Sequence, residues 1–532
     1  YLEEENNYTE HHLKDTKGIQ KTLFDEIKGR IKLDDESIPF KDRNYEYWTK
    51  TTTKGNYSIK LRKKIGTDLI EEYWNGDEEK KKLNTEYFGV GDIEVSYNDK
   101  ILGYSLDLKG SEYYTIYLRD IETNKIISEK IEDTAGGITF SLDDKFIFYS
   151  KLDKFHRPRK IYRHKIGDNI SNDKLIFEEK SDAFTVGINL TSDEKYFIIT
   201  SSDHNTSEQY YFKSTEENPE PKLIKKRNKG IIYSVNSWDN HFYNHTNEKA
   251  EDFKIDYCND LSIQDWKSYI PAQEETLIGS LFFLNNWILR SEISNALPKI
   301  FVKNIKTNQE EEIKFTDEKI IDPGISFYQK DRDTDLIYLS YSSPKTQSRT
   351  YLYNLKSKER KLVKEQEIPS GHNPEDYIVE RLECNSHDGR KVPITLTRHK
   401  KTKVDGTANV LLYGYGSYGS SMSPSFSSTK FSLIDRDIIW VTAHIRGGME
   451  RGMKWWKEGK LLNKKNTFED YLAVGEFLIK NKYTSKKKII GFGGSAGGLL
   501  LGAVVNQKPE LFLAMILAVP FVDSLTTNLD HS

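Results

Sequence analysis

A polar turn followed by an apolar strand recurs through much of the chain, and this repeat limits the possible folds more than any other feature. Three clear copies begin at Asn98, Asp143 and Asp193, so the period is between 45 and 50 residues. In each copy a second strand rich in Tyr, Ile or Phe follows the first. Repeats of this length with about four strands are typical of propeller blades, which stack because none can bury both faces alone. The sequence therefore predicts an all-β propeller, with a β-solenoid or a pair of sandwiches as the alternative.

The repeated region extends from about residue 43 to about residue 370. Its later copies, near residues 231–242, 277–290 and 336–352, are less regular than the first three. Counting all of them gives a propeller of about seven blades over residues 43–370.

The first 42 residues follow a different pattern. Ile19, Leu23, Ile27 and Ile31 stand four residues apart, the spacing of one apolar stripe on a helix. We therefore expect residues 1–42 to form a helical segment that packs on a later domain.

Past a linker near residues 369–376, which contains Gly and Pro, strands alternate with helices. The alternating elements are a hairpin at residues 378–398, strands at 410–413, at 438–443 and ending at 490, and a helix at 468–480. Such alternation predicts a mainly parallel sheet with helices on its faces, here in a domain spanning residues 371–532.

The segment 488–501, KIIGFGGSAGGLLL, joins the end of a strand to the start of a helix through a glycine turn. Gly493 to Gly497 fit G-x-S-x-G, the nucleophile elbow of α/β-hydrolases. A nucleophilic serine must project from a tight turn, and the backbone there tolerates almost no side chain two residues to either side. The following helix directs its first N–H groups at the site, so the N–H of Ala496 can bind the oxyanion formed when Ser495 attacks a carbonyl.

The same glycines allow a second interpretation. Gly491, Gly493 and Ala496 also satisfy G-x-G-x-x-A, the dinucleotide-binding fingerprint, which glycine-rich turns often match by accident. That fingerprint belongs to the first strand–helix turn of its sheet, whereas this one comes late, so the context favours the elbow.

Composition argues against several other classes of protein. A chain of 532 residues predicts at least two domains, and its formal net charge of −3 gives no reason to expect nucleic acid as a partner. Cys258 and Cys384 are too few for a disulfide framework or a cysteine-rich metal site. No apolar run is long enough to span a membrane, so we expect a cytoplasmic protein without membrane contact. The chain begins at Tyr1 rather than Met, so an initial segment and its targeting signal are open questions.

Several short motifs together resemble the prolyl oligopeptidase family of serine peptidases, most closely its oligopeptidase B branch. The resemblance covers nearly the whole chain. The motifs are Tyr1 to Asn6, Gly29 to Lys32, Ser386 to Gly389 with Val392-Pro393, Leu412 to Gly416, Ile445 to Gly448, Lys464 to Phe468, Gly493 to Gly498 and Val519 to Asp523. The resemblance implies a seven-bladed propeller capping an α/β-hydrolase domain, with residues 1–42 packed on the latter. It also implies an endopeptidase for short peptides, a monomer or homodimer, that cuts after Arg or Lys in the oligopeptidase B branch and after Pro in the other.

The resemblance also assigns site residues. It makes Ser495 the nucleophile, the hydroxyl of Tyr415 and the N–H of Ala496 the oxyanion donors, and Phe521 the ring that flanks the side chain before the cleaved bond. The sequence alone leaves open that Tyr415 and Phe521 are packing residues. Serine acyl transfer needs neither a metal nor an organic cofactor, and we expect none.

Two departures from the family pattern stand out. Met449 and Arg451 interrupt the motif Arg-Gly-Gly-Gly-Glu and its usual apolar or aromatic successor, which puts the shape of that loop in question. In addition, the triad Asp and His of α/β-hydrolases follow the serine, yet only Asp523, Asp530 and His531 do so here.

All three lie too near the serine in sequence to complete a triad. The hydrolase domain is therefore expected to be incomplete, truncated after the elbow. The alternatives are a catalytically incomplete fragment that serves as a binding scaffold, a propeller interaction protein, and a prolyl-specific oligopeptidase.

Overall fold

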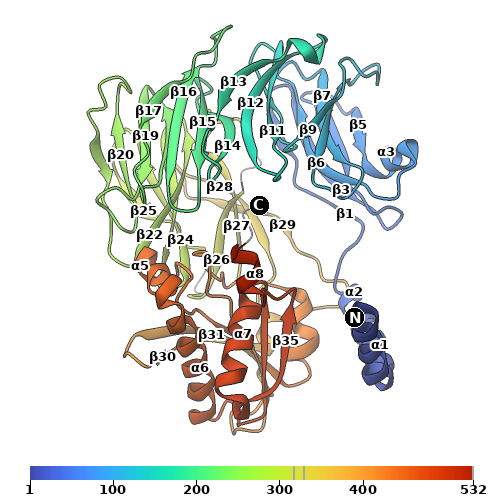
Figure 1. Cartoon of the computed structure of the whole chain (residues 1–532), viewed down its shortest axis with the longest axis vertical. Helices are drawn as coiled ribbons and strands as arrows, with labels where there is room; N and C mark the ends of the chain where they lie inside the picture. The colour runs from blue at the N-terminus through green and yellow to red at the C-terminus, as the bar shows by residue number, and fades with distance from the viewer. Residues whose placement is uncertain (316–317, 327–329, 530–532) are drawn as a thin grey trace.

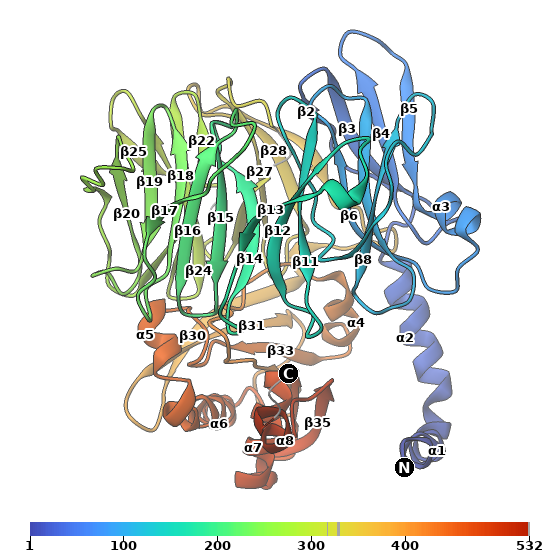
Figure 2. The same cartoon turned by 45° about the horizontal axis from the view of Figure 1, so that its top comes forward.

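The computed structural model describes residues 1–315, 318–326 and 330–529 (Figure 1). The chain forms a β-rich half, drawn at the top of Figure 1, and an α/β half below it. Figure 2 shows the sheets of the upper half arranged side by side around a common axis, as in a propeller.

Within the described residues, the strands of the upper half form six hydrogen-bonded sheets. The first contains β1 (Asp35–Glu36), β2 (Phe40–Asp42), β3 (Tyr45–Thr51), β4 (Ile59–Lys64) and β5 (Ile70–Asn75), and α3 (Gly76–Leu83) follows it. The second contains β6 (Gly89–Val95), β7 (Ile101–Asp107), β8 (Tyr114–Asp120), β9 (Ile131–Thr134), β10 (Thr139–Phe140), β11 (Phe146–Leu152), β12 (Pro158–Lys165) and β13 (Lys174–Glu178).

The remaining four sheets have four antiparallel strands each. They are β14 (Thr185–Leu190), β15 (Tyr196–Ser202), β16 (Ser207–Lys213) and β17 (Lys222–Lys225); β18 (Tyr233–Trp238), β19 (His241–Thr246), β20 (Lys254–Cys258) and β21 (Lys267–Ile270); β22 (Thr276–Leu284), β23 (Trp287–Ser294), β24 (Leu297–Asn304) and β25 (Glu310–Glu312); and β26 (Asp322–Ser326), β27 (Leu336–Ser342), β28 (Arg349–Asn354) and β29 (Arg360–Glu365).

The prediction of a propeller is confirmed, but the prediction of seven blades is wrong. Among the described strands, five sheets are separate units of blade size, whereas the sheet from β6 to β13 runs through eight strands without a break. The reason is β9, which pairs with β8 on one side and, through Thr134 and Lys151, with β11 on the other. This one pairing joins two sequence repeats into a single sheet.

The repeated turns have one shared geometry. Asp99, Asp144 and Glu194 all adopt left-handed backbone angles, with φ of 61°, 55° and 60°, a conformation that Asp and Asn tolerate better than most residues. The carboxylate of Asp144 also accepts hydrogen bonds from the N–H groups of Tyr97 (2.6 Å) and Asn98 (2.7 Å). The turn at Asp144 thus also contacts the preceding repeat.

The lower half is built on one six-stranded sheet in the order β30-β31-β33-β32-β34-β35. Its strands are β30 (Tyr377–Asn385), β31 (Lys391–His399), β32 (Asn409–Tyr413), β33 (Ile438–Ala443), β34 (Ile489–Gly494) and β35 (Phe512–Ala518), and its helices are α4 (Phe431–Ile434), α5 (Gly452–Lys457), α6 (Lys465–Lys480), α7 (Ala496–Gln507) and α8 (Ser524–Leu529). The pairs β32–β33, β32–β34 and β34–β35 are parallel, whereas β30–β31 is the predicted antiparallel hairpin.

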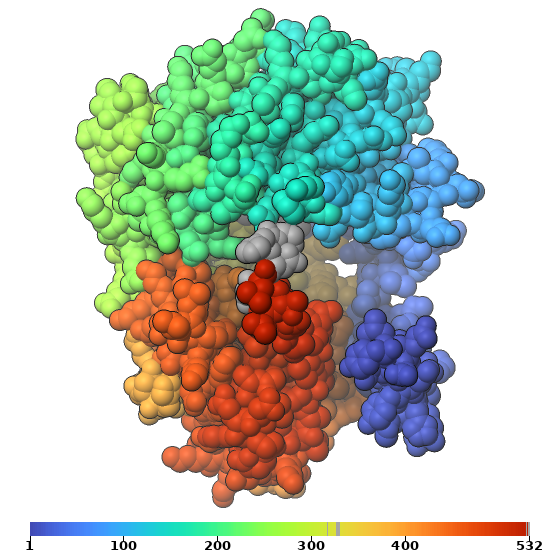
Figure 3. All heavy atoms as spheres, viewed as in Figure 1, coloured from blue at the N-terminus to red at the C-terminus, as the bar shows by residue number. Residues whose placement is uncertain are grey.

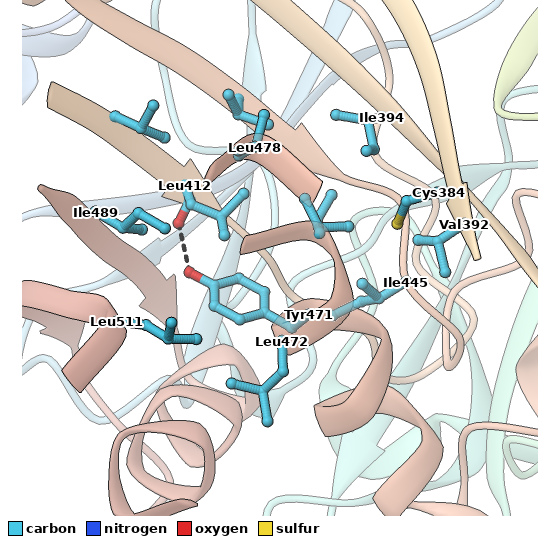
Figure 4. Packing of buried hydrophobic residues seen from close by; sticks show 14 of the residues in the cluster. Cys384, Val392, Ile394, Leu412, Ile445, Tyr471, Leu472, Leu478, Ile489 and Leu511 are labelled. Atoms are coloured by element: carbon cyan, nitrogen blue, oxygen red, sulfur yellow. Dashed lines mark hydrogen bonds between the residues drawn. The ribbon is translucent and has the colours of Figure 1, made fainter. Parts of the chain in front are cut away.

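The core of this half lies between the sheet and α6 and α7 (Figure 4). Tyr471 of α6 is fully buried, and its hydroxyl donates a 2.7 Å hydrogen bond to the carbonyl oxygen of Leu412 in β32. Leu472, Leu500 and Ile489 pack around it without solvent exposure. This packing fixes α6 and α7 against the strands that end at the candidate site.

The chain begins with two helices, α1 (Leu2–Leu13) and α2 (Lys17–Gly29), which form a lobe beside the α/β half (Figure 3). The end of α2 and the residue after it are joined to the two residues that follow α4 by ion pairs of Arg30 with Asp435 (2.9 Å) and of Glu26 with Arg436 (2.6 Å). The division at residues 42 and 370 stays a prediction.

Candidate active site

Ser495 stands alone between β34 and α7, in the predicted order of strand, turn and helix. Its backbone has φ 53° and ψ −118°, a strained conformation for a residue with a side chain. The turn is held by its own backbone, since the N–H of Ser495 donates to Ala518 O and its carbonyl accepts from the N–H of Gly498, both at 2.9 Å. The result is an exposed serine side chain on a fixed turn.

The glycines of the motif have a steric reason. A Cβ at Gly493 would lie 2.6 Å from the carbonyl oxygen of Gly497, and a Cβ at Gly497 would lie 2.8 Å from that of Gly414. Both contacts are with backbone atoms, which cannot move aside cheaply. Ala496 is buried at the first position of α7, where the N–H group lacks an acceptor inside the helix.

Tyr415 lies beside this turn. It follows β32 by two residues, and its Cδ2 is 3.5 Å from the position that a Cβ on Gly497 would take. The side chain is half-buried, and its hydroxyl makes no hydrogen bond to any described residue. The hydroxyl is therefore available to donate to another group.

Phe521 also reaches the turn. Its N–H donates a 2.9 Å hydrogen bond to the carbonyl oxygen of Ser495, and its ring is partly exposed. The structure therefore brings all four predicted site residues, Ser495, Ala496, Tyr415 and Phe521, to one end of β32 and β34.

A buried ionic cluster supports the loops around the site. Arg446 donates to both carboxylate oxygens of Asp470 (Nε, 2.8 Å; Nη2, 2.6 Å), and its Nη1 donates to Asp388 (2.5 Å). Ser386 Oγ donates to Asp470 as well (2.5 Å). Arg446 and Asp470 are almost completely buried, so these two charges depend on each other. The sequence predicted the motifs of Arg446 and Asp388 but missed Asp470, whose only signal is a carboxylate on the buried face of a predicted helix.

The cluster shifts the ionisation of its members. Burial raises the pKa of Asp388, but the hydrogen bonds and charge of Arg446 outweigh it and leave that pKa below its ordinary value. Burial likewise opposes the charge of Arg446, whereas Asp470 and Asp388 raise its pKa above the ordinary value. Arg446 and Asp388 are therefore charged at neutral pH.

The loop with the unusual residues Met449 and Arg451 bends sharply. Gly447 has φ 104°, and a Cβ there would lie 1.9 Å from Gly416 O. Gly419 N–H donates to Gly447 O (2.9 Å), so this loop supports the loop of Tyr415. Arg451 donates to Glu383 (2.6 Å) and Asn295 (2.8 Å), where an apolar residue could not.

No histidine or carboxylate among residues 1–315, 318–326 and 330–529 hydrogen-bonds the hydroxyl of Ser495. His444 is fully buried and shares a 2.8 Å hydrogen bond with Thr395, and Asp523 accepts one from the N–H of Thr526 at the start of α8. Asp530 and His531 lie outside the described residues.

In the described part of the chain, no group of three or more His, Cys, Asp or Glu side chains is placed to hold a metal ion. No helix among these residues is long and apolar enough to cross a membrane.

Comparison with known proteins places these features in context. The family model described as "Prolyl oligopeptidase, N-terminal beta-propeller domain" matches residues 1–366, and the model described as "Prolyl oligopeptidase family" matches residues 424–532. Dipeptidyl aminopeptidase BI of Pseudoxanthomonas mexicana is 33% identical over 549 residues, which cover 100% of this chain and 75% of that protein. Protease 2 of Moraxella lacunata is 30% identical over 541 residues, with 100% and 77% covered.

Solved structures agree with these matches. Oligopeptidase B from Trypanosoma brucei, in a closed form with covalently bound antipain, superposes with a TM-score of 0.93 at 29% identity, covering 99% of this chain and 76% of that one. Oligopeptidase B from Leishmania major gives a TM-score of 0.94 at 27% identity with the same coverage.

Proposed function

The chain belongs to the prolyl oligopeptidase family of serine peptidases, and we propose that it hydrolyses short peptides after Arg or Lys with Ser495 as the nucleophile. One observation carries the proposal. Ser495 projects from a strained turn that also brings Tyr415 and the N–H of Ala496 to the same place.

The chemistry follows from this arrangement. Ser495 Oγ attacks the carbonyl carbon of the scissile peptide bond, and the carbonyl oxygen becomes an oxyanion. The N–H of Ala496 and the hydroxyl of Tyr415 are the donors that would stabilise it. Collapse of this intermediate expels the amine and leaves an ester on Ser495, which water then hydrolyses. The group that accepts the serine proton is not among the described contacts of Ser495.

Specificity for a basic side chain rests on Phe521. The hydrogen bond between its N–H and Ser495 fixes its backbone beside the nucleophile. A guanidinium or ammonium group stacks favourably on an aromatic ring.

Restriction to short peptides rests on the position of the propeller. Figures 1 and 3 show the β-rich half lying directly over the α/β half. A folded protein would not fit between the halves, whereas a short flexible peptide could reach Ser495. We also propose a cytoplasmic monomer or homodimer, since Cys258 and Cys384 are both free thiols, as suits a reducing compartment.

The test uses the protein as encoded by its natural gene and fluorogenic peptides with Arg, Lys or Pro before the bond. We expect cleavage after Arg and Lys, and a loss of about 10³-fold or more in kcat for Ser495→Ala. Retained turnover in that variant would exclude Ser495 as the nucleophile, and preference for Pro would reject the specificity. For the 532-residue chain we expect less than about 1 turnover per second, because no described histidine contacts the serine.

A second candidate is removal of dipeptides from a free amino terminus, which the name of the relative from Pseudoxanthomonas mexicana suggests. Acetylated and free forms of one peptide separate the two activities. An endopeptidase cleaves both, whereas a dipeptidyl aminopeptidase requires the free amine.

A further inference from the structure

Lys464 places its ammonium group against the loop that carries Tyr415. Its Nζ donates to the carbonyl oxygen of Gly416 (2.5 Å) and to the hydroxyl of Ser417 (2.7 Å). These are the two residues that follow Tyr415 in the chain. The lysine itself stands immediately before α6, far from this loop in sequence.

A lysine in this place is costly. No carboxylate in the described ranges lies within ion-pair distance of its nitrogen, and burial lowers its pKa to about 8. The lysine also occupies the N-cap position of α6, where the helix dipole disfavours a positive charge.

The loop that it holds has little freedom elsewhere. Gly416 has φ 68°, and a Cβ there would lie 2.4 Å from Thr467 Cγ2 and 2.9 Å from Arg446 O. The far end is held by the hydrogen bond from Gly419 N–H to Gly447 O (2.9 Å). Between these points, the hydrogen bond from Lys464 holds the carbonyl of Gly416. This carbonyl sets the direction of the peptide plane between Gly416 and Ser417, one peptide bond after the one that joins Tyr415 to Gly416.

We propose that Lys464 is a positioning residue for the oxyanion hole: it holds the carbonyl of Gly416 so that the Tyr415 hydroxyl stays beside Ser495. The inference rests on the proposed function, because the role of Tyr415 belongs to it. Lys464 acts through Tyr415 and does not touch the substrate. Small displacements of a catalytic group can cost about 10²-fold in rate, so the hydrogen bond of Lys464 is sufficient to matter.

The experiment measures kcat and KM for an arginyl peptide in the protein encoded by the natural gene. The variants are Lys464→Met, which keeps the length and removes the donor, Lys464→Arg, which keeps a donor, Tyr415→Phe, and the double variant Lys464→Met/Tyr415→Phe. Lys465→Met is the matched control, since Lys465 is the next residue, is exposed and makes no ion pair within the described part of the chain.

We expect Tyr415→Phe to lower kcat by about 10²-fold or more. Lys464→Met should lower kcat by about 10-fold or more with little change in KM, and Lys464→Arg should restore part of it. The double variant should match Tyr415→Phe alone, because the lysine has nothing to position once the hydroxyl is gone. Lys465→Met should behave as wild type.

Three results would overturn the inference. They are a Lys464→Met kcat within about twofold of wild type, a double variant in which the two losses multiply, and a loss confined to KM. Thermal unfolding of each variant shows whether it folds. If Lys464→Met does not fold, the Lys464→Arg variant provides the test. A kcat of Lys464→Arg equal to that of Tyr415→Phe would then reject the positioning role of Lys464. A wild-type protein that cleaves no peptide rejects the proposed function and the inference together, whereas an active wild type with an unaffected Lys464→Met rejects only the inference.

Discussion

The N–H of Phe521 donates a 2.9 Å hydrogen bond to the carbonyl oxygen of Ser495. The N–H of Ser495 in turn donates to Ala518 O at the end of β35, also at 2.9 Å. Two backbone hydrogen bonds therefore tie the segment after β35 to the nucleophile turn. The position of Phe521 depends on the backbone, so its side chain can be changed without moving Ser495.

Phe521→Ala tests the ring separately from the turn. We expect KM for an arginyl peptide to rise by about 2- to 30-fold, the range of a lost cation–π contact, while kcat stays within about threefold of wild type. Phe521→Tyr is the control because it keeps an aromatic face. Steady-state kinetics of the three proteins decide, and an unchanged KM in Phe521→Ala would show that the ring does not contact the basic side chain.

Gly493 and Gly502 form a matched pair for the elbow. A Cβ on Gly493 would meet backbone oxygens at 2.6 and 3.0 Å, whereas a Cβ on Gly502, inside α7, meets nothing within 4 Å. Gly493→Ala should therefore lower Tm and abolish labelling of Ser495 by a fluorophosphonate. Gly502→Ala should stabilise the protein by about 0.5–1 kcal/mol through helix propensity. Equal effects of the two changes would contradict the steric account.

The elbow could be predicted because its chemistry needs Gly493, Ser495 and Gly497 next to one another in sequence. The partner of Arg446 could not, because Asp470 lies on another element and only the packing of α6 brings it within 2.6 Å. Lys464 belonged to a recognised motif, yet its contact with Gly416 O becomes visible only in three dimensions.

The propeller, too, could be predicted only in part from the sequence. The repeated turns gave its architecture, because Asp99, Asp144 and Glu194 specify left-handed turns through local chemistry. The number of separate sheets depends on whether neighbouring edges pair. A single contact between Thr134 and Lys151 joins two repeats, and no pattern in the sequence marks it.

Arg446→Met should be strongly destabilising. It leaves the fully buried carboxylate of Asp470 without its counter-ion, and breaking a buried pair in this way costs about 3–5 kcal/mol. Lys508→Met removes an exposed ion pair with Glu476 and should change the free energy of unfolding by less than about 1 kcal/mol. Chemical denaturation of both variants compares them directly, and similar losses would mean that the Arg446 cluster is not buried in solution.

Asp388 makes the contribution of this cluster to stability depend on pH. Its pKa is lowered in the folded state, so its contribution to stability is fully present above its ordinary pKa of about 3.8 and is lost as pH falls below that value. The stability difference between wild type and Asp388→Asn should therefore shrink between pH 6 and pH 3. A constant difference in thermal unfolding over that range would contradict the ion pair with Arg446.

Arg451 and Asn295 connect the two halves of the molecule. Arg451 Nη2 lies 2.8 Å from Asn295 Oδ1, and the N–H of Ala296 donates to Glu450 O (2.8 Å). In a double-mutant cycle of Arg451→Met with Asn295→Gly, which suits the positive φ of that turn, we expect a coupling of about 0.5–3 kcal/mol.

The control is a more exposed ion pair across the same interface, between Lys457 and Glu251 at 2.7 Å. Its coupling should stay below about 0.5 kcal/mol because water screens it. If both cycles gave equal couplings, Arg451 would have no special role in joining the halves.

The ionisation of Lys464 should change how the stability of the protein depends on pH. Burial lowers its pKa to about 8 in the folded protein from an ordinary value of 10.5, and among the described residues its nitrogen donates hydrogen bonds to Gly416 O and Ser417 Oγ. Between these two pH values the unfolded chain holds a proton that the folded protein has released, so stability gains a rising contribution with pH. The Tm of wild type relative to Lys464→Met should therefore increase from pH 8 to pH 10, whereas Lys465→Met should track wild type. A flat difference for Lys464→Met over this range would show that the ammonium group is hydrated, and the buried contact with the Tyr415 loop would not exist in solution.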